Sequence, residues 1–291
     1  MVFGTNTVIE LKKEFIIELS ELYEFEEAAS IFFIILEHYA GMKRLDLALN
    51  PNSTLDSKQM DLIGVALTQL KQNKPVQQII GVSHFFNLEF QLSRDVLIPR
   101  PETEELVDWI LTDISMEVNQ DFKILDIGTG SGCIPVCLKY TSPNITMHAI
   151  DVSEKALEVA GLNAQKHQVD IRFNQLDILN KEERSKMGAF DIIVSNPPYI
   201  KNSEKDLMRK NVLDHEPDIA LFVSDEDPLL FYREIAEFAL EHLNSKGLLY
   251  FEINEAHGQQ MIEMLKSKGF TNIILKQDLF GKDRMMKAIR Q

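Results

Sequence analysis

The chain has 291 residues, which is enough for one large domain or for a large domain and a small one. Its 30 Lys and Arg against 45 Asp and Glu give a formal charge of −15, and a surface of this sign repels phosphate backbones, so we do not expect nucleic acid as a direct partner. The longest apolar run, 31–36, is too short to span a bilayer, and residues 1–13 lack the basic-then-apolar order of a signal peptide. We therefore expect a cytoplasmic protein with no membrane partner.

The N-terminal quarter of the chain shows helical spacing of apolar residues throughout. Val8, Leu11, Phe15 and Leu19 begin this pattern, and comparable runs continue to the Lys-Pro pair that ends near residue 75. The pattern predicts a small all-helical domain over residues 1–75. Its first thirty positions are rich in Glu, which indicates either a solvated face or a docking face for a basic partner.

Residues 76–102 change character and predict a β-hairpin linker. Phe and Leu alternate with polar residues over 85–92, in short stretches broken by turn residues. The linker ends in Leu97-Ile-Pro-Arg-Pro-Glu-Thr-Glu104, where two prolines flank Arg100 and favour an extended segment before a helix capped near Thr103. This rigid frame suggests a wall or a lid over a site.

From residue 122 onward strands and helices alternate, which predicts a doubly wound α/β sheet in a second domain over residues 103–291. The expected helices lie near 131–141, 153–167, 203–213, 228–244 and 257–268. The expected strands are 123–127, 146–151, 170–173, 191–195, 248–253, 272–276 and 285–289.

A glycine-rich loop, Leu125-Asp-Ile-Gly-Thr-Gly-Ser-Gly132, follows the first expected strand and opens a helix. Its glycines permit a tight turn and let a ligand approach backbone N–H groups closely. A dinucleotide-binding fingerprint needs Gly or Ala at the position that Cys133 occupies. The Gly-x-Gly-x-Gly spacing instead resembles motif I of class I S-adenosylmethionine-dependent methyltransferases. The candidate cofactor residues of this loop are Gly128, Thr129, Gly130, Ser131 and Gly132.

Two acidic residues stand where the next strands end. Asp151 closes the second strand, and a carboxylate at this point of an α/β sheet binds both hydroxyls of a ribose. The alternative role, a helix cap, is already served by Ser153. Asp177 follows the third strand, and the resemblance implies that it meets an adenine amine while Ile178 packs on the ring. A surface-loop acid is the alternative for Asp177.

The stretch Asp191-Ile-Ile-Val-Ser-Asn-Pro-Pro-Tyr-Ile200 combines a buried strand with a stiff loop. The two prolines after Asn196 forbid both helix and ladder pairing, so the loop stands at the carboxyl end of the strand, where such sheets bind ligands. An amide side chain, the rigid carbonyl of Pro197 and the ring of Tyr199 meet there. Together they suit a planar group that carries an NH2.

With Ile98-Pro-Arg-Pro-Glu-Thr-Glu104 upstream, these motifs closely resemble peptide chain release factor glutamine methyltransferases of the HemK/PrmC type. The resemblance implies a seven-stranded class I methyltransferase sheet whose last strand is antiparallel. It implies that S-adenosylmethionine is the cofactor, with S-adenosylhomocysteine as product. It also implies that class 1 release factors are the protein substrates and that the enzyme is a monomer. The helical domain would recognise them. The implied cofactor residues are the five of the glycine loop with Asp151, Asp177, Ile178 and Asn196.

The resemblance also implies how the substrate is held. The Asn196 oxygen and the Pro197 carbonyl would accept the two amide hydrogens of the glutamine in a Gly-Gly-Gln motif, Pro198 would stiffen the loop, and Tyr199 would stack on the amide. No metal is expected, because the histidines show no ligand spacing. Two alternatives stay open: a nucleic acid methyltransferase acting on an adenine amine, which the negative charge disfavours, and a binding protein that keeps only the cofactor fold.

Overall fold

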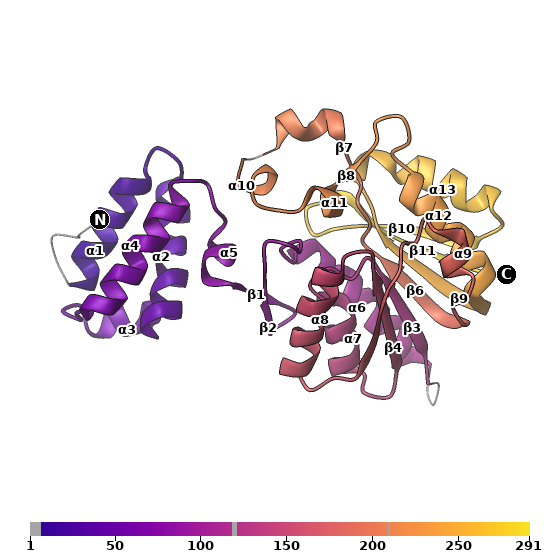
Figure 1. The fold of residues 1–291 in the computed structure, drawn as a ribbon, viewed down its shortest axis with the longest axis horizontal. Helices are drawn as coiled ribbons and strands as arrows, with labels where there is room; N and C mark the ends of the chain where they lie inside the picture. Colours follow the sequence, from indigo (N-terminus) through magenta and orange to yellow (C-terminus); the bar gives the residue numbers. More distant parts are fainter. Residues whose placement is uncertain (1–6, 118–120, 209) are drawn as a thin grey trace. The chain divides into compact units, whose positions relative to one another are not determined.

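The computed structural model describes residues 7–117, 121–208 and 210–291 (Figure 1). The chain forms two compact units. One comprises the described parts of residues 1–81 and 209–215, and the other comprises residues 82–208 and 216–291, again where described. The first unit is therefore completed by a short segment that lies far along the chain from its helices.

The first unit is all-helical, as the apolar spacing predicts. Asp56 caps its fourth helix by accepting a hydrogen bond from the Gln59 N–H, and Gly41 ends the second helix in a left-handed conformation that suits glycine. The core of the unit includes an edge-to-face contact between Phe15 and Phe32, with ring centroids 5.3 Å apart. Its helices are α1 (Val8–Leu19), α2 (Phe25–Ala40), α3 (Arg44–Leu49), α4 (Ser57–Leu70), α5 (Val76–Ile80) and α10 (Lys210–Leu213).

The second unit opens with a β-hairpin, β1 (Val82–Phe85) and β2 (Leu88–Gln91), which pair antiparallel. Phe86 and Asn87 both adopt positive φ, 49° and 61°, as a tight two-residue hairpin turn requires. The hairpin is thus shorter than the stretch from which it was predicted. Residues 76–80 instead form α5, which has Pro75 as its N-cap and is ended by the left-handed Gly81.

The main sheet of the second unit has seven strands in the order β10-β11-β9-β6-β3-β4-β5. Strands β9, β6, β3, β4 and β5 run parallel to one another, whereas β11 is antiparallel to both β9 and β10. The predicted sheet with an antiparallel last strand is confirmed. The strands are β3 (Lys123–Ile127), β4 (Thr146–Asp151), β5 (Ile171–Gln175), β6 (Phe190–Ser195), β9 (Leu243–Glu252), β10 (Thr271–Gln277) and β11 (Asp283–Ile289).

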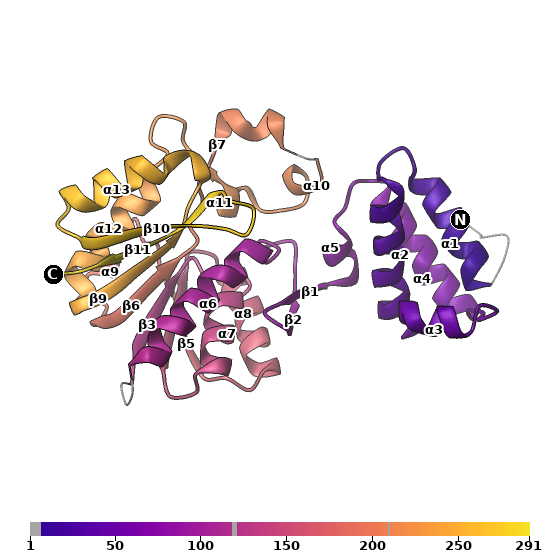
Figure 2. The ribbon, with the colours of Figure 1, turned by 180° about the vertical axis from the view of Figure 1, so that it is seen from behind.

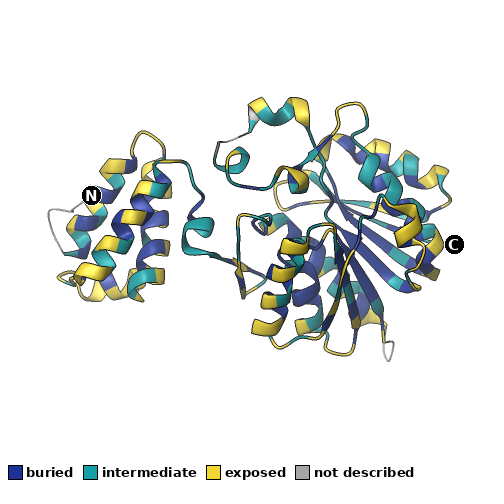
Figure 3. Cartoon of the chain, in the orientation of Figure 1, coloured by how far each residue is buried: buried dark blue, intermediate teal, exposed yellow. Residues whose placement is uncertain are grey.

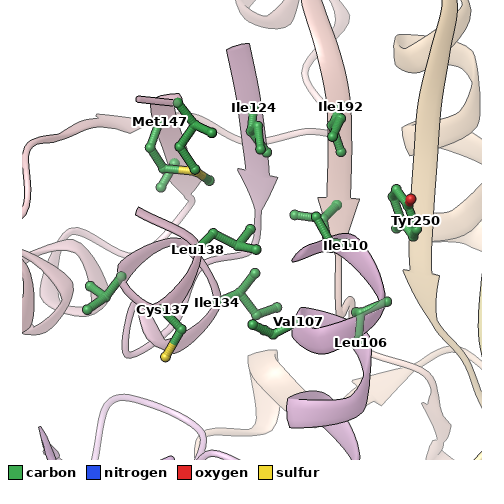
Figure 4. Close-up of a cluster of buried hydrophobic side chains, with 14 of the residues drawn as sticks. Leu106, Val107, Ile110, Ile124, Ile134, Cys137, Leu138, Met147, Ile192 and Tyr250 are labelled. Carbon is green, nitrogen blue, oxygen red and sulfur yellow. The ribbon is translucent and has the colours of Figure 1, made fainter. Parts of the chain in front are cut away.

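Helices cover both faces of this sheet, which is why its central strands β3 and β6 are almost wholly buried, whereas the edge strands β5 and β10 are more exposed (Figures 2 and 3). One face packs on α6 (Pro101–Met116), α7 (Cys133–Thr141) and α8 (Glu154–Lys166), and the other packs on α12 (Leu230–His242) and α13 (Gly258–Ser267). Figure 4 shows the first cluster, where Ile110 of α6 and Leu138 of α7 meet Ile124 and Ile192 of the sheet.

Trp109, the single tryptophan of the chain, lies on α6 beside this cluster. Its ring meets Tyr250 of β9 edge to face, with centroids 5.6 Å apart. The ammonium groups of Lys276 and Lys287, from β10 and β11, lie 5.3 and 5.2 Å from the ring centroid. The indole therefore ties α6 to three strands of the sheet.

Two details differ from the sequence-based expectations. The helix expected over 203–213 is wrong as one element: a 3-10 helix covers Asn202–Leu207, Met208 is extended, and α10 follows in the first unit, with residue 209 outside the described residues. Helix α6 begins at Pro101 with Arg100 as its N-cap, since proline suits the first helical position. Thr103 is therefore inside the first turn.

The remaining elements are short. They are α9 (Lys181–Arg184), α11 (Asp218–Leu221), a 3-10 helix at Glu255–His257, and the parallel pair β7 (Ile200–Lys201) and β8 (Phe222–Val223). None of the helices in the described ranges combines the length and the apolar character that crossing a bilayer requires.

The core packing predicts a large cost for Ile110→Ala. Ile110 is fully buried between α6 and the sheet, so its truncation should lower the free energy of unfolding by about 3 kcal/mol. Urea denaturation measures this change. The matched control is Leu162→Ala on α8, where the side chain is 51% exposed and the change should stay below about 0.5 kcal/mol. Equal effects of the two substitutions would contradict this account of the core.

Candidate active site

A cavity of about 220 Å³ lies at the carboxyl ends of the parallel strands, in the second unit. The loops after β3, β4, β5 and β6 all contribute to its wall, as expected for a sheet of this architecture. Several predicted site residues that are far apart in sequence therefore share one cavity. Those that line it are Gly128, Gly130, Asp151, Asp177, Ile178, Asn196, Pro197 and Pro198.

The glycine loop contributes open backbone to the cavity. Gly128 and Gly130 have positive φ, 75° and 54°, and a Cβ added to either would meet no atom within 4 Å. Their N–H groups are already engaged, because Gly128 donates to the Ile150 carbonyl and Gly130 donates to the Asp151 carboxylate, both at 2.9 Å. The loop thus offers a ligand close approach to its surface, while these two N–H groups hold the loop against β4.

Asp151 is held firmly at the end of β4. One carboxylate oxygen accepts from the Gly130 N–H and the other from the Ser153 N–H, each at 2.9 Å. Burial raises the pKa of Asp151, and these backbone hydrogen bonds oppose the rise. Each oxygen keeps a further lone pair, so the carboxylate can accept one more hydrogen bond at each oxygen, as a pair of ribose hydroxyls would require. Ser153 itself caps α8 by accepting from the Ala156 N–H, as predicted.

The remaining predicted cofactor residues differ in their placement. Asp177 and Ile178 line the cavity, and Asp177 accepts a hydrogen bond from the Leu179 N–H at 2.9 Å. Thr129, Ser131 and Gly132 do not belong to the cavity wall. The Ser131 carbonyl accepts from the buried side chain of Asn163, and a Cβ on Gly132 would come within 2.9 Å of the Ala160 Cβ. These two positions pack the loop against α8.

The loop after β6 places Asn196, Pro197 and Pro198 on the cavity wall. The strand ends are tied together just before it, because the Ser195 hydroxyl donates to the Ile127 carbonyl at 2.7 Å. Tyr199 lies off the wall, partly buried, and its hydroxyl donates to Glu252 at 3.1 Å. Stacking of Tyr199 on a substrate stays a prediction.

The Pro-Arg-Pro-Glu-Thr-Glu segment ties distant parts of the site to the start of α6. The Thr103 hydroxyl donates to Glu252 at 2.6 Å, Glu104 accepts from the Phe86 N–H of the hairpin, and Glu105 accepts from the Leu279 N–H. The sequence did not predict the hydrogen bond between Thr103 and Glu252. The only signal for it was the position of Glu252, a carboxylate at the end of an apolar strand.

Arg100 anchors the segment that walls the cavity rather than lining the cavity itself. Its guanidinium lies 2.6 Å from a carboxylate oxygen of Glu216, and the other oxygen of Glu216 accepts from the Ile98 N–H at 3.2 Å. Just before this anchor, residues 95–97 line the cavity, and Val96 packs on α8. The cavity is therefore walled by the residues just before the Pro-Arg-Pro frame, and that frame does not line it.

Asp126 is a further residue that sequence reasoning passed over. It lies in β3 directly before the glycine loop, it is fully buried, and neither of its oxygens meets a donor at hydrogen-bond geometry among the described residues. Burial raises its pKa to about 7; the nearby Thr129 hydroxyl opposes the rise and the charge of Asp151 adds to it. Asp126 does not line the cavity itself, but its charge lies close to that of Asp151, which does. An acid inside an apolar strand was the available signal.

In the described parts of the chain, no group of three or more His, Cys, Asp or Glu side chains is placed to hold a metal ion. Cys133 and Cys137 are free thiols at the start of α7, and Cys137 is fully buried in the core beside the sheet.

Comparison with known proteins identifies the family. Residues 10–81 match the model of the PrmC N-terminal domain, and residues 109–216 match that of the methyltransferase small domain. The release factor glutamine methyltransferase of Flavobacterium psychrophilum is 47% identical over 278 residues, covering 95% of this chain and 97% of the relative. The chain belongs to the release factor glutamine methyltransferase family. The family of enzymes that the motifs resemble is thereby confirmed.

Other members of the release factor glutamine methyltransferase family are also similar along nearly their whole length. The protein of Bacteroides thetaiotaomicron is 41% identical and that of Bacillus subtilis 35%, with 96% and 98% of those chains covered. Among solved structures, the METTL16 methyltransferase domain aligns with a TM-score of 0.54 at 17% identity, over 79% of this chain and 95% of that one. This last likeness shows a shared fold.

The unpaired carboxylate predicts an unusual pH dependence of stability. Because the folded-state pKa of Asp126 is raised from 3.8 to about 7, its neutral form stabilises the fold at low pH, and this contribution is lost as the pH rises from about 4 to about 7. Asp126→Asn, which stays neutral, should therefore gain stability over the wild type across this range, by up to about 4 kcal/mol, and then hold a constant lead. Thermal unfolding of both proteins without ligand from pH 4 to pH 9 measures the gap. A gap that does not change with pH would refute the assignment.

Proposed function

We propose that this protein transfers a methyl group from S-adenosylmethionine to the side-chain amide nitrogen of the glutamine in the Gly-Gly-Gln motif of class 1 peptide chain release factors. Membership of the release factor glutamine methyltransferase family supports the reaction class and the protein substrate. The single observation that carries the finer proposal is the cavity itself. Its wall joins Asp151, Asp177 and the loop at Asn196, which supports a nucleoside site that would be continuous with an amide-binding loop.

The chain's own residues fit such a cofactor. Asp151 would accept the ribose hydroxyls, Asp177 would accept from the adenine amine, and Ile178 would pack on the ring. Asp126, whose buried oxygens have no hydrogen-bond partner among the described residues, would favour the α-amino cation through its charge next to Asp151. Gly128 and Gly130 leave the room that the ligand needs, with Thr129, Ser131 and Gly132 completing the loop. When bound, the cofactor supplies an electrophilic methyl group.

An amide nitrogen is a weak nucleophile because its lone pair is delocalised into the carbonyl. The Asn196 oxygen and the Pro197 carbonyl would accept its two hydrogens, orient the nitrogen and stabilise the positive charge that develops on it. The two prolines hold this loop in one conformation, so the acceptors are placed before the substrate arrives. Tyr199 would pack on the flat amide. The proton of the methylated amide is acidic enough to pass to water without a strong base.

Residues 1–75 would recognise the release factor, and residues 103–291 would bind the cofactor and carry out the reaction. Residues 76–102 would link these two domains. We expect a monomer that works in the cytoplasm. The charge of −15 supports a protein substrate over a nucleic acid one. The test is transfer of labelled methyl from S-adenosylmethionine to purified release factor, with the label located by peptide mapping. Label on an adenine base, or on a residue other than the Gly-Gly-Gln glutamine, would refute the proposal.

Substitutions at Asn196 should separate chemistry from cofactor binding. Asn196→Ala removes an acceptor that is placed in advance, which costs about 3 kcal/mol of transition-state stabilisation, or roughly a hundredfold in kcat. Asn196→Asp adds a charge and should be comparably slow, whereas Tyr199→Phe keeps the ring and should be milder. Steady-state kinetics and calorimetry with S-adenosylhomocysteine measure the two properties, and product affinity should change little.

Asp151→Ala provides the opposite control, because it should weaken cofactor binding before it affects the chemical step. A release factor whose Gly-Gly-Gln glutamine is replaced by asparagine should be methylated poorly, since its amide is one methylene shorter. Equal rates on the two release factors would contradict the glutamine-specific grip.

Removal of the helical unit should abolish recognition of the substrate while the cofactor site survives. A protein that begins at Val82 lacks the N-terminal part of the helical unit, which ends at Gly81, and it keeps the short segment 209–215 and every residue of the cavity. It should bind S-adenosylhomocysteine with unchanged affinity in calorimetry, which also shows that it is folded, but methylate release factor with a greatly raised KM. Full activity of the shortened protein would show that the helical unit is not a recognition module.

A further inference from the structure

A buried carboxylate lies beneath the loop at Asn196 on the same side of the sheet as α6. Glu252 is the last residue of β9 and is 1% exposed. One of its oxygens accepts from the Thr103 hydroxyl at 2.6 Å, and the other accepts from the Tyr199 hydroxyl at 3.1 Å. Thr103 in turn lies 3.4 Å from the Asn196 amide nitrogen. The carboxylate thus contacts the loop that the proposed function assigns to the substrate directly at Tyr199, and it reaches Asn196 through Thr103.

The direction of these hydrogen bonds matters. A carboxylate only accepts, so the single hydroxyl proton of Thr103 must point at Glu252. The Thr103 oxygen is then left with lone pairs alone and can only accept from Asn196. The two ends of an asparagine amide have nearly the same shape, so this network decides which end faces Thr103. It selects the NH2 end, and the amide oxygen faces the other way.

We propose that Glu252 is a positioning residue for amide methylation, which acts through Thr103 to hold the Asn196 side chain with its oxygen free to accept from the substrate amide. This inference rests on the proposed function and adds to it the residue that sets the polarity of the grip. We name the three residues Glu252, Thr103 and Asn196 the amide relay. The second hydrogen bond of Glu252, from Tyr199, holds the far end of the same loop.

The relay requires Glu252 to be ionised. Burial raises the pKa of Glu252; the hydrogen bonds from Thr103 and Tyr199 and the charge of Arg284 oppose the rise, and the charge of Glu102 adds to it. A protonated Glu252 could donate to Thr103, whose own proton would then turn toward Asn196 and favour the reversed amide. Titratable groups face Glu252 from every element around it: Glu102 of α6, Cys133 of α7, Tyr199 of the loop, Tyr232 of α12 and Arg284 of β11.

The experiment compares variants that break the relay at different points. Glu252→Gln replaces an acceptor by a group that can donate, and Thr103→Val removes the hydroxyl while keeping the shape. Each should lower kcat roughly a hundredfold, as misplacement of a reacting group does, with KM and S-adenosylhomocysteine affinity nearly unchanged. The double variant should be no slower than either single one, because both interrupt one chain of contacts. Thr103→Ser restores the hydroxyl and should retain most of the activity.

Asp113→Asn is the matched control. Asp113 of α6 accepts a hydrogen bond from the Tyr250 hydroxyl of β9. This pair also joins a carboxylate to a tyrosine, and it connects the same helix and strand as the relay, but neither residue lines the cavity. It should leave kcat unchanged. The pH profile provides a further readout, because wild-type kcat should fall on acidification through the raised pKa of Glu252, and this fall should be absent in Glu252→Gln.

The outcomes separate the two levels of the argument. A wild-type protein that transfers no methyl to release factor refutes the proposed function and the relay with it. A wild type that transfers methyl while a folded Glu252→Gln or Thr103→Val does so equally fast refutes the relay alone. Additive losses in the double variant, or a comparable loss in Asp113→Asn, would also overturn it, since they indicate general packing. Circular dichroism and product binding establish which variants are folded, and either relay variant suffices for the test.

Discussion

The reversal of strand order at β3 is the constraint on which the site depends. Strands β4 and β5 follow on one side of β3, and β6 and β9 lie on the other, so the loops that leave β3 and β6 diverge at the carboxyl edge of the sheet. The hydrogen bond from Ser195 to Ile127 holds the strand ends together just below this divergence. Acids from the β4 and β5 side and an amide loop from the β6 side therefore face a common cavity.

Features that depend on the local backbone were accessible from sequence. The spacing of Gly128 and Gly130, the acid that closes β4 at Asp151 and the double proline after Asn196 each constrain a few consecutive residues, and the structure places all of them on the cavity. The alternation of elements likewise predicted the sheet, because apolar runs between turns are a local signal. Helix α5 was missed since it is only five residues long, and so short an apolar pattern does not distinguish a helix from a strand.

Features that depend on distant residues were not accessible. Thr103 and Glu252 are separated by 149 positions, so their hydrogen bond exists only once β9 lies beside β6 under α6. The same is true of Glu104 and Glu105, whose carboxylates look like partners of the helix dipole until the hairpin and the Leu279 loop reach them. A single strand pattern shows which residues are buried, and it does not show which polar groups will meet there.

The packing of Trp109 gives the protein a built-in optical probe. Trp109 is the only indole of the chain and packs between α6 and three strands of the second unit. Its fluorescence emission therefore reports on the second unit alone, because the helical unit contains no tryptophan. Detachment of α6 would expose the ring to water and remove the two lysines from its faces. Since the same helix carries Thr103 at its start, fluorescence and circular dichroism together can distinguish loosening of the site from melting of the helical unit.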